Sequence, residues 1–149
     1  MIVAWKLIPR RHRGEAFSGE GARLAAGRWN ARGIRAVYLS GSLSLAALEM
    51  LVYAGRASFR MPLTLFRVNI PEDVTVETLT KEKLPSNWKE QPPSDSTRRL
   101  GTDWIARGTA VALRVPSPLI AEDWNLLINP GHPDFSSLKI SKPQVFRFV

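Results

Sequence analysis

Short runs of bulky apolar residues, several of them alternating with small or polar ones, predict the strands of this chain. These runs cover residues 2–8, 36–39, 64–70 and 110–115. A last strand is predicted over residues 145–149, at the carboxyl end. Proline or a glycine- and serine-rich turn follows most of the runs, which supports their interpretation as separate strands.

One helix is predicted after the serine-rich turn at residues 40–44, because its serines can cap a helix that Gly55 then ends. The helix is apolar almost all round, which predicts that it is buried. Glu49 alone breaks its apolar surface.

The rest of the chain has weaker periodicity. A short helix is predicted around residues 97–106, with Leu100 and Trp104 on one face. Residues 71–97 are rich in proline, serine and charge, which predicts a surface excursion, and residues 121–135 are interpreted as a polar loop.

Glycines recur throughout residues 17–33, which predicts an irregular segment. Gly19 and Gly21 lack a preceding strand and a third glycine at the spacing of a dinucleotide-binding loop, so a Rossmann fold is excluded. Strands and helices do not alternate regularly and no repeat occurs. The pattern therefore predicts an α+β fold in one domain spanning residues 1–149.

Composition narrows the function classes. The chain has 149 residues, a formal net charge of +8 and no cysteine. The absence of cysteine excludes disulfides, thiolate nucleophiles and Cys-based zinc sites, and favours a reducing cytosol. No signal peptide or membrane span is predicted, so a cytoplasmic protein is expected.

The positive charge predicts a polyanionic partner: nucleic acid, a phosphorylated small molecule or an acidic protein. The cluster Arg10, Arg11, His12 and Arg13 could form a nucleic-acid patch, but such a short run is more often a solvated strand end. Charge alone does not choose among these partners.

Three residues stand out as candidates for chemistry. Glu49 must be paired, hydrogen-bonded or functional if its helix is buried, whereas at a helix edge it would simply meet solvent. Arg28, beside Gly27 and Trp29, could bind phosphate oxygens with both ends of its guanidinium, although a lone loop arginine is more often a surface residue. Tyr38 could stack on a base or a nicotinamide ring, or fill the core.

Ser117 lies between Pro116 and Pro118 in a stiff loop and could hydrogen-bond at a cleft. It lacks the glycine-flanked elbow of a serine hydrolase, and His12 and His132 are the chain's only histidines. The sequence around His132 is better explained as a rigid turn. Two histidines without cysteine also argue against a metal site.

Three blocks resemble the successive signature blocks of the RES family, toxins of bacterial toxin–antitoxin pairs. They read FSGEGARLAAGRWNARG, AVYLSGSLSLAALEMLV and LRVPSPLIAEDWNLLINPGHPDF, and the intermediate pieces LPSNWKE and GTDWIARG also match. The blocks occur in the family's order and cover most of the chain. The resemblance implies a compact fold similar to the ADP-ribosyltransferase core, with small mixed or antiparallel sheets and few helices.

The resemblance also implies roles for particular residues. Glu49, Arg28 and Tyr38 take the catalytic positions of an enzyme that cleaves NAD⁺, its substrate, without a metal. Arg28, Tyr38, Ser117, Lys6 and Asn129 are expected to bind NAD⁺, and Asn125, Asn129 and His132 to shape the cleft. Family members often have an aromatic–arginine pair on the first strand, where this chain has Trp5 and Lys6. Lys6 keeps the charge but lacks the planar fork of arginine.

The acceptor of ADP-ribose stays open between water, phosphate and a protein side chain. The resemblance implies a cognate Xre-like, helix-turn-helix antitoxin that blocks the cleft, with a protein acceptor and a homodimer as open options. The alternative is a basic nucleic-acid-directed toxin, either a ribonuclease that uses His12 or His132 or a non-enzymatic binder.

Overall fold

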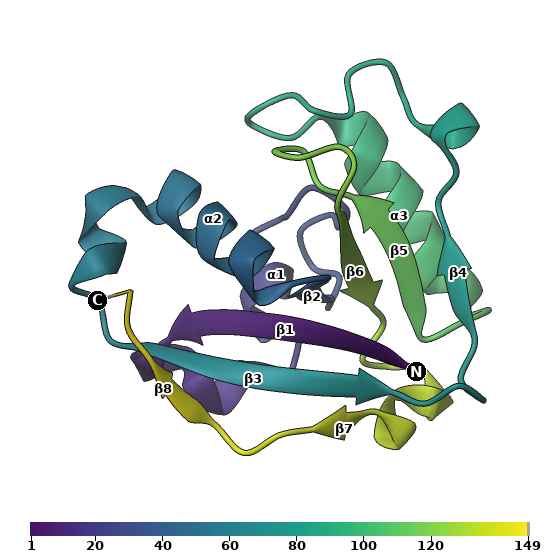
Figure 1. Cartoon of the computed structure of the whole chain (residues 1–149). Coiled ribbons are helices and arrows are strands. Elements are labelled where there is room, and N and C mark those ends of the chain that lie inside the picture. Colours follow the sequence, from purple (N-terminus) through teal and green to yellow (C-terminus); the bar gives the residue numbers. More distant parts are fainter. Residues whose placement is uncertain (149) are drawn as a thin grey trace.

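Most of the chain forms one strongly curled sheet, shown in Figure 1. A computed structural model describes residues 1–148. Its strands are β1 (Ile2–Pro9), β2 (Val37–Ser40), β3 (Leu63–Ile70), β4 (Val76–Thr78), β5 (Ala112–Pro116), β6 (Trp124–Ile128), β7 (Lys139–Ile140) and β8 (Gln144–Phe146). They follow the order β4-β5-β6-β2-β1-β3-β7, and β8 also pairs with β3. Only the β4–β5 pair is parallel; the other described pairs are antiparallel.

The helices are short and few. The α-helices are α1 (Glu20–Leu24), α2 (Leu43–Ala54) and α3 (Asp95–Arg107), and the 3₁₀ turns are η1 (Arg10–Glu15), η2 (Gly55–Phe59), η3 (Lys81–Lys83) and η4 (Pro133–Ser137). The predicted α+β class is confirmed. The strands form a single mixed sheet, and α2 and α3 pack near different parts of it (Figure 1).

Two apolar clusters hold the sheet and helices together. One contains Leu126 and Ile128 of β6 with residues of β1, β2 and β3, and the other contains Leu127 with Trp104 of α3 and Trp29. Since successive strand residues face opposite sides, β6 is buried on both faces. This burial explains its run of consecutive apolar residues, which the sequence analysis wrongly assigned to a polar loop.

Other expectations need smaller corrections. The segment 71–97 contains β4, and the glycine-rich segment contains α1. The second predicted helix begins at Asp95, two residues earlier than expected, and the last strand covers Gln144–Phe146 rather than 145–149. Val149 lies outside the described residues.

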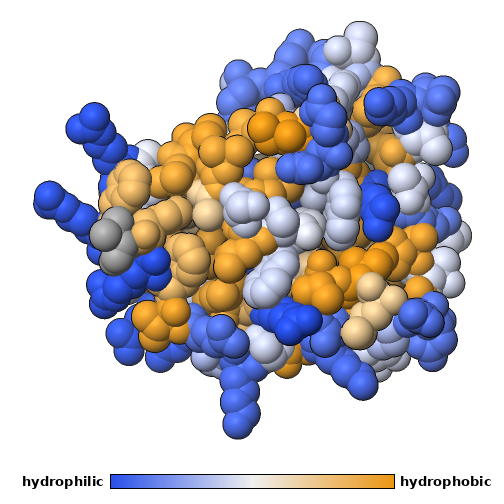
Figure 2. All heavy atoms as spheres, viewed as in Figure 1, coloured by the Kyte–Doolittle hydropathy of each residue, from blue (hydrophilic) through white to orange (hydrophobic). Residues whose placement is uncertain are grey.

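Helix α2 begins as its sequence predicts, because the Ser42 side chain accepts a hydrogen bond from the Leu45 backbone N–H (3.1 Å). Gly55 ends it with a positive φ of 67°. The predicted burial of the helix is wrong: Leu48 is 37% exposed and Val52 is 53% exposed. Figure 2 shows apolar side chains gathered on this face. An evenly apolar helix does not reveal which of its sides meets the sheet.

Candidate functional site

Two adjoining cavities of about 350 and 270 Å³ form a cleft between α2, the strands β1 and β2, and the loops around residues 26–29 and 91–93. Four residues line both cavities: Tyr38, Glu49, Tyr53 and Asn125. The point where the cavities meet is therefore surrounded by a carboxylate, an amide and two phenol rings. This cleft is the candidate functional site.

Glu49 is held in place from one side only. Its Oε2 accepts hydrogen bonds from Ser117 Oγ (3.0 Å) and Asn125 Nδ2 (2.9 Å). Its Oε1 accepts no hydrogen bond from any residue in 1–148. The carboxylate is thus fixed by one oxygen while the other is free to interact with a molecule in the cleft.

Ser117 lies behind Glu49 and does not line the cleft. It is fully buried, and besides donating to Glu49 its Oγ accepts from the backbone N–H groups of Leu119 (3.2 Å) and Ile120 (3.4 Å). The family resemblance predicts that this hydroxyl contacts NAD⁺. The geometry instead makes it a support for the Glu49 carboxylate.

Asn125 reaches Glu49 because β6 brings it beside β2, where it pairs with Ser40. Its amide nitrogen donates to Glu49, whereas its Oδ1 is buried without a hydrogen-bond partner in the described chain. A buried acceptor without a donor is costly. Asn125 therefore acts on the cleft through the hydrogen bond that its amide nitrogen donates to Glu49.

Arg28 lines the larger cavity, but its guanidinium is already engaged. It is buried and donates to the carbonyl oxygens of Trp88 (2.9 Å) and Glu90 (2.8 Å) and to Gln91 Oε1 (3.0 Å). These bonds fasten the loop at residues 88–91 to the cleft, so that Gln91 becomes part of its wall.

Tyr38 is fixed at its hydroxyl. The hydroxyl donates to Asn30 Oδ1 (2.5 Å) and accepts from the Trp29 backbone N–H (3.1 Å). Burial raises the pKa of Tyr38, so the phenol stays neutral. Gly27 makes this contact possible, since a Cβ there would lie 2.6 Å from the Tyr38 hydroxyl oxygen. The ring can therefore pack against a ligand but cannot act as a base.

Lys6 lies in the smaller cavity with Trp5. Its Nζ donates to the Tyr38 carbonyl oxygen (3.2 Å). Burial lowers the pKa of Lys6 to about 8. The ammonium is therefore charged at neutral pH and lies on the opposite half of the cleft from Arg28.

Comparison with known proteins identifies the family. The RES domain family model matches residues 3–148. The chain belongs to the RES domain family. The Toxin Res of Yersinia enterocolitica serotype O:8 / biotype 1B is 35% identical over 148 residues, covering 99% of this chain and 97% of that protein. The Prs ADP-ribosylating toxin of Sphingobium sp. (strain YBL2) is 33% identical over 142 residues, covering 93% and 88%.

The fold is also shared with a solved structure. A chain in the crystal structure of the M. tuberculosis MbcT-MbcA toxin–antitoxin complex superposes on this RES domain with a TM-score of 0.78 and 18% identity, covering 98% of this chain and 84% of that one. At this level of identity the likeness establishes the fold.

The remaining predicted residues of the RES domain lie outside the cleft lining. Asn129, at the opposite end of β6 from Asn125, donates to the Ile105 carbonyl oxygen (3.3 Å) and accepts from the Gly131 N–H (3.0 Å). His132 Nδ1 accepts from the Asp134 N–H (3.0 Å), the geometry of the rigid turn expected there. Both side chains organise the turn after β6.

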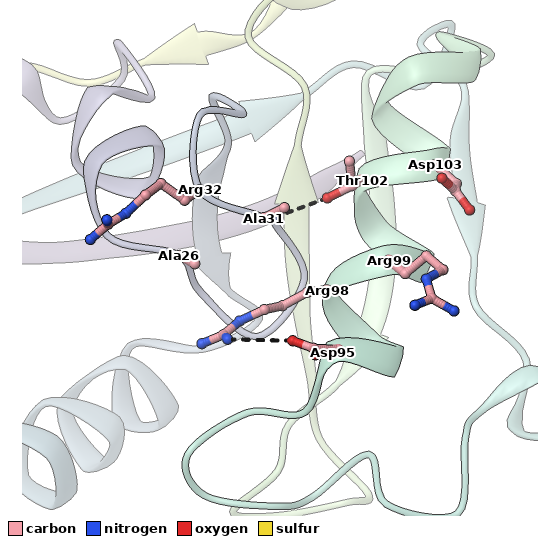
Figure 3. A pocket seen from close by; sticks show the side chains of 8 residues that line it. All are labelled: Ala26, Ala31, Arg32, Asp95, Arg98, Arg99, Thr102 and Asp103. Carbon is pink, nitrogen blue, oxygen red and sulfur yellow. Dashed lines mark hydrogen bonds and ion pairs between the residues drawn. The ribbon is translucent and has the colours of Figure 1, made fainter.

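A larger cavity of about 640 Å³ lies on the other side of the loop that carries Arg28. Its arginines do not converge on one point: Figure 3 shows Arg32 and Arg98 extending to the same side and Arg99 lying apart from them. Within it, Arg98 lies 4.0 Å from Asp95, and the Ala31 N–H donates to Thr102 Oγ1 (2.9 Å). The first contact lies within α3 and the second fixes the loop to α3, so the two do not surround a common point.

The cleft residues not predicted from the sequence include Tyr53 and Gln91. Tyr53 lies one turn after Glu49 on α2, and the four-residue spacing places both on one face of the helix, so this signal was available. Gln91 lines the cleft because Arg28 binds the loop at residues 88–91 through hydrogen bonds. No local sequence pattern predicts this long-range contact.

Two classes of feature are absent from the described residues. No group of three or more His, Asp or Glu side chains in 1–148 is arranged to hold a metal ion. No helix in that range is both long and apolar enough to cross a membrane.

Proposed function

We propose that this RES domain is the toxin of a toxin–antitoxin pair and that it cleaves the nicotinamide–ribose bond of NAD⁺ in the cytoplasm. The observation that carries the proposal is the Glu49 carboxylate, held at Oε2 by Ser117 and Asn125 and open to the cleft at Oε1. Family membership and the naming of one relative as an ADP-ribosylating toxin support the same chemistry.

The reaction needs a fixed negative charge more than an acid. When the bond between nicotinamide and the ribose carbon breaks, its electron pair leaves with nicotinamide as a neutral molecule, and positive charge develops on the sugar. A carboxylate placed beforehand next to this carbon stabilises that charge or holds a ribose hydroxyl. Glu49 Oε1 takes this role, and an acceptor oxygen then bonds to the sugar carbon and loses its proton.

The two cavities suggest how NAD⁺ lies. Lys6 supplies the positive charge in the lining of the smaller cavity, which suits the pyrophosphate. Arg28 donates three hydrogen bonds to the loop at residues 88–91, so we assign it to shaping the larger cavity, where Tyr38 and Gln91 would contact the nicotinamide ring and its amide.

The acceptor decides the reaction class. Water would make the enzyme a glycohydrolase, phosphate a phosphorylase and a protein side chain an ADP-ribosyltransferase. The relative named Prs ADP-ribosylating toxin favours the last of these. A cognate antitoxin, Xre-like according to the family resemblance, would cover the cleft, and an acidic partner suits the net charge of +8.

The test is to incubate the purified chain with NAD⁺, with and without phosphate, and to follow nicotinamide and adenine-containing products. We expect nicotinamide release that Glu49→Gln abolishes, while Glu122→Gln, an exposed glutamate outside the cleft, leaves it unchanged. ADP-ribose would identify water as acceptor, and its 1-phosphate would identify phosphate. Release by Glu49→Gln at the wild-type rate would refute the proposed role of this carboxylate.

A further inference from the structure

The basic cluster that follows β1 belongs to an arginine-lined cavity at one end of the sheet. The cavity has a volume of about 310 Å³, and its polar lining consists of Arg10, Arg13, Arg147, Thr64 and Gln144. It shares no lining residue with the NAD⁺ cleft. The cluster is therefore part of a second concave surface rather than an isolated strand end.

The strand register explains why these arginines meet. Leu63, the first residue of β3, pairs with Pro9 of β1 on one side and with Phe146 of β8 on the other. Arg10 and Arg147 directly follow those two partners, so they lie at the same end of β3, one after each of the strands that flank it. The Arg10 N–H also donates to the Pro62 carbonyl oxygen (2.9 Å), which anchors the start of η1 to this end of β3.

The positive charge of this surface is not neutralised by the described chain. The cavity lining contains no carboxylate, and none of the ion pairs formed within residues 1–148 involves Arg10, Arg11, Arg13 or Arg147. Arg11 and His12 are exposed beside the cavity. A concentration of unpaired guanidinium groups creates a local positive potential that attracts polyanions.

We propose that this surface, formed by η1 and the end of β8, binds the phosphodiester backbone of a nucleic acid. Arginine, threonine and glutamine are side chains that contact phosphate oxygens, and the cavity presents all three. Arg11 continues the positive surface beyond the cavity, so a polymer of phosphates engages more of it than a single small anion would. The proposal is independent of NAD⁺ cleavage because the two sites share no residue.

The test measures binding of a short fluorescein-labelled DNA duplex of arbitrary sequence by fluorescence anisotropy between about 50 and 200 mM salt. We expect binding that weakens steeply with salt. The triple variant Arg10→Gln, Arg13→Gln, Arg147→Gln should weaken binding about tenfold or more at low salt and lower the slope of log K against log salt by about 0.9 for each lost contact.

A matched control removes the same charge elsewhere. Arg32→Gln, Arg99→Gln and Arg107→Gln change exposed residues on α3 or in the loop that contacts it, outside the cavity of the η1 surface, and should leave most of the affinity. The triple variant at the η1 surface should have the melting temperature and the rate of NAD⁺ cleavage of the wild type. Failure of the nucleic-acid proposal can therefore be distinguished from failure of the proposed NAD⁺ cleavage.

Three results would overturn the inference. The first is no duplex binding by the wild type at low salt. The second is an equal loss in both triple variants, which would mean that net charge alone drives binding. The third is tighter binding of a polyglutamate peptide than of the duplex at this surface, which would identify an acidic protein segment as the partner.

Discussion

Ser117 Oγ and Glu49 Oε2 are 3.0 Å apart, and this hydrogen bond joins residues 68 positions apart in the chain. The serine is fully buried, whereas the glutamate lines the cleft. The hydroxyl is itself oriented by the N–H groups of Leu119 and Ile120. The stiff loop after β5 thus sets the position of a carboxylate on α2.

Removing either donor to Glu49 should slow catalysis more than it weakens binding. A hydrogen bond to a charged group contributes about 1.5–3 kcal/mol, and about 1.4 kcal/mol corresponds to a tenfold change in rate. We therefore expect Ser117→Ala and Asn125→Ala each to lower kcat for NAD⁺ cleavage by about 10- to 100-fold, measured as nicotinamide release.

The effect on KM distinguishes two roles for Ser117: positioning of Glu49 and direct binding of the substrate. A small change in KM is expected for Ser117→Ala, since the side chain lies behind Glu49. Ser136→Ala removes an exposed hydroxyl that does not line the cleft, and it serves as the control. A large rise in KM at unchanged kcat would contradict the positioning role.

Arg28→Lys should disturb the wall of the cleft while keeping its charge. Lysine cannot reproduce the fork that donates to Trp88, Glu90 and Gln91 at once. We expect faster amide hydrogen exchange in residues 88–91 and a higher KM for NAD⁺. Unchanged exchange in this loop would show that Arg28 does not fasten it.

The sequence predicted which residues form the site better than it predicted the contacts between them. Glu49 was singled out because a lone carboxylate in an apolar helix needs a partner, and the structure supplies Ser117 and Asn125. The partners themselves depend on the pairing of β6 with β2, and β6 was interpreted as a loop because its buried apolar run lies between polar residues. Long-range pairing carries no local signal of this kind.

The same reasoning explains the error at α2. An apolar helix was expected to be covered on all sides, yet only Leu45 and Ala46 are buried on it. Lys6 was placed correctly on a strand, whereas its lowered pKa follows from burial that only the folded chain defines. Residue identity therefore predicted the chemistry, and tertiary packing determined the environment.

Gly101→Ala should destabilise the fold more than any other glycine-to-alanine change near the cleft. A Cβ at Gly101 would overlap the Trp29 carbonyl group, so α3 would have to move away from the loop that carries Arg28. Overpacking of this kind costs about 1–3 kcal/mol, measured by urea unfolding.

Gly21→Ala is the matched control, since it lies in α1 and a Cβ there meets nothing within 4 Å. We expect it to leave stability unchanged or to raise it by up to about 1 kcal/mol. If Gly101→Ala were as stable as Gly21→Ala, the close packing of α3 on Trp29 would be wrong.

Lys6 should make both stability and NAD⁺ binding depend on pH. Burial lowers its pKa from 10.5 in the unfolded chain to about 8 in the folded one. Between these values the unfolded state holds more protons, so the free energy of unfolding should rise with pH from about 8 to 10.5, and the buried charge destabilises the fold below that window. Lys6→Met should accordingly be more stable than the wild type at pH 7, with the difference shrinking across the same window.

NAD⁺ binding should respond in the opposite direction. As the ammonium loses its proton above pH 8, it loses its attraction for the pyrophosphate, so the KM of the wild type should rise. Lys6→Arg stays charged and should show no such rise. Parallel KM profiles for the two proteins between pH 7 and about 9.5 would mean that Lys6 does not hold the substrate, because only lysine titrates in that range.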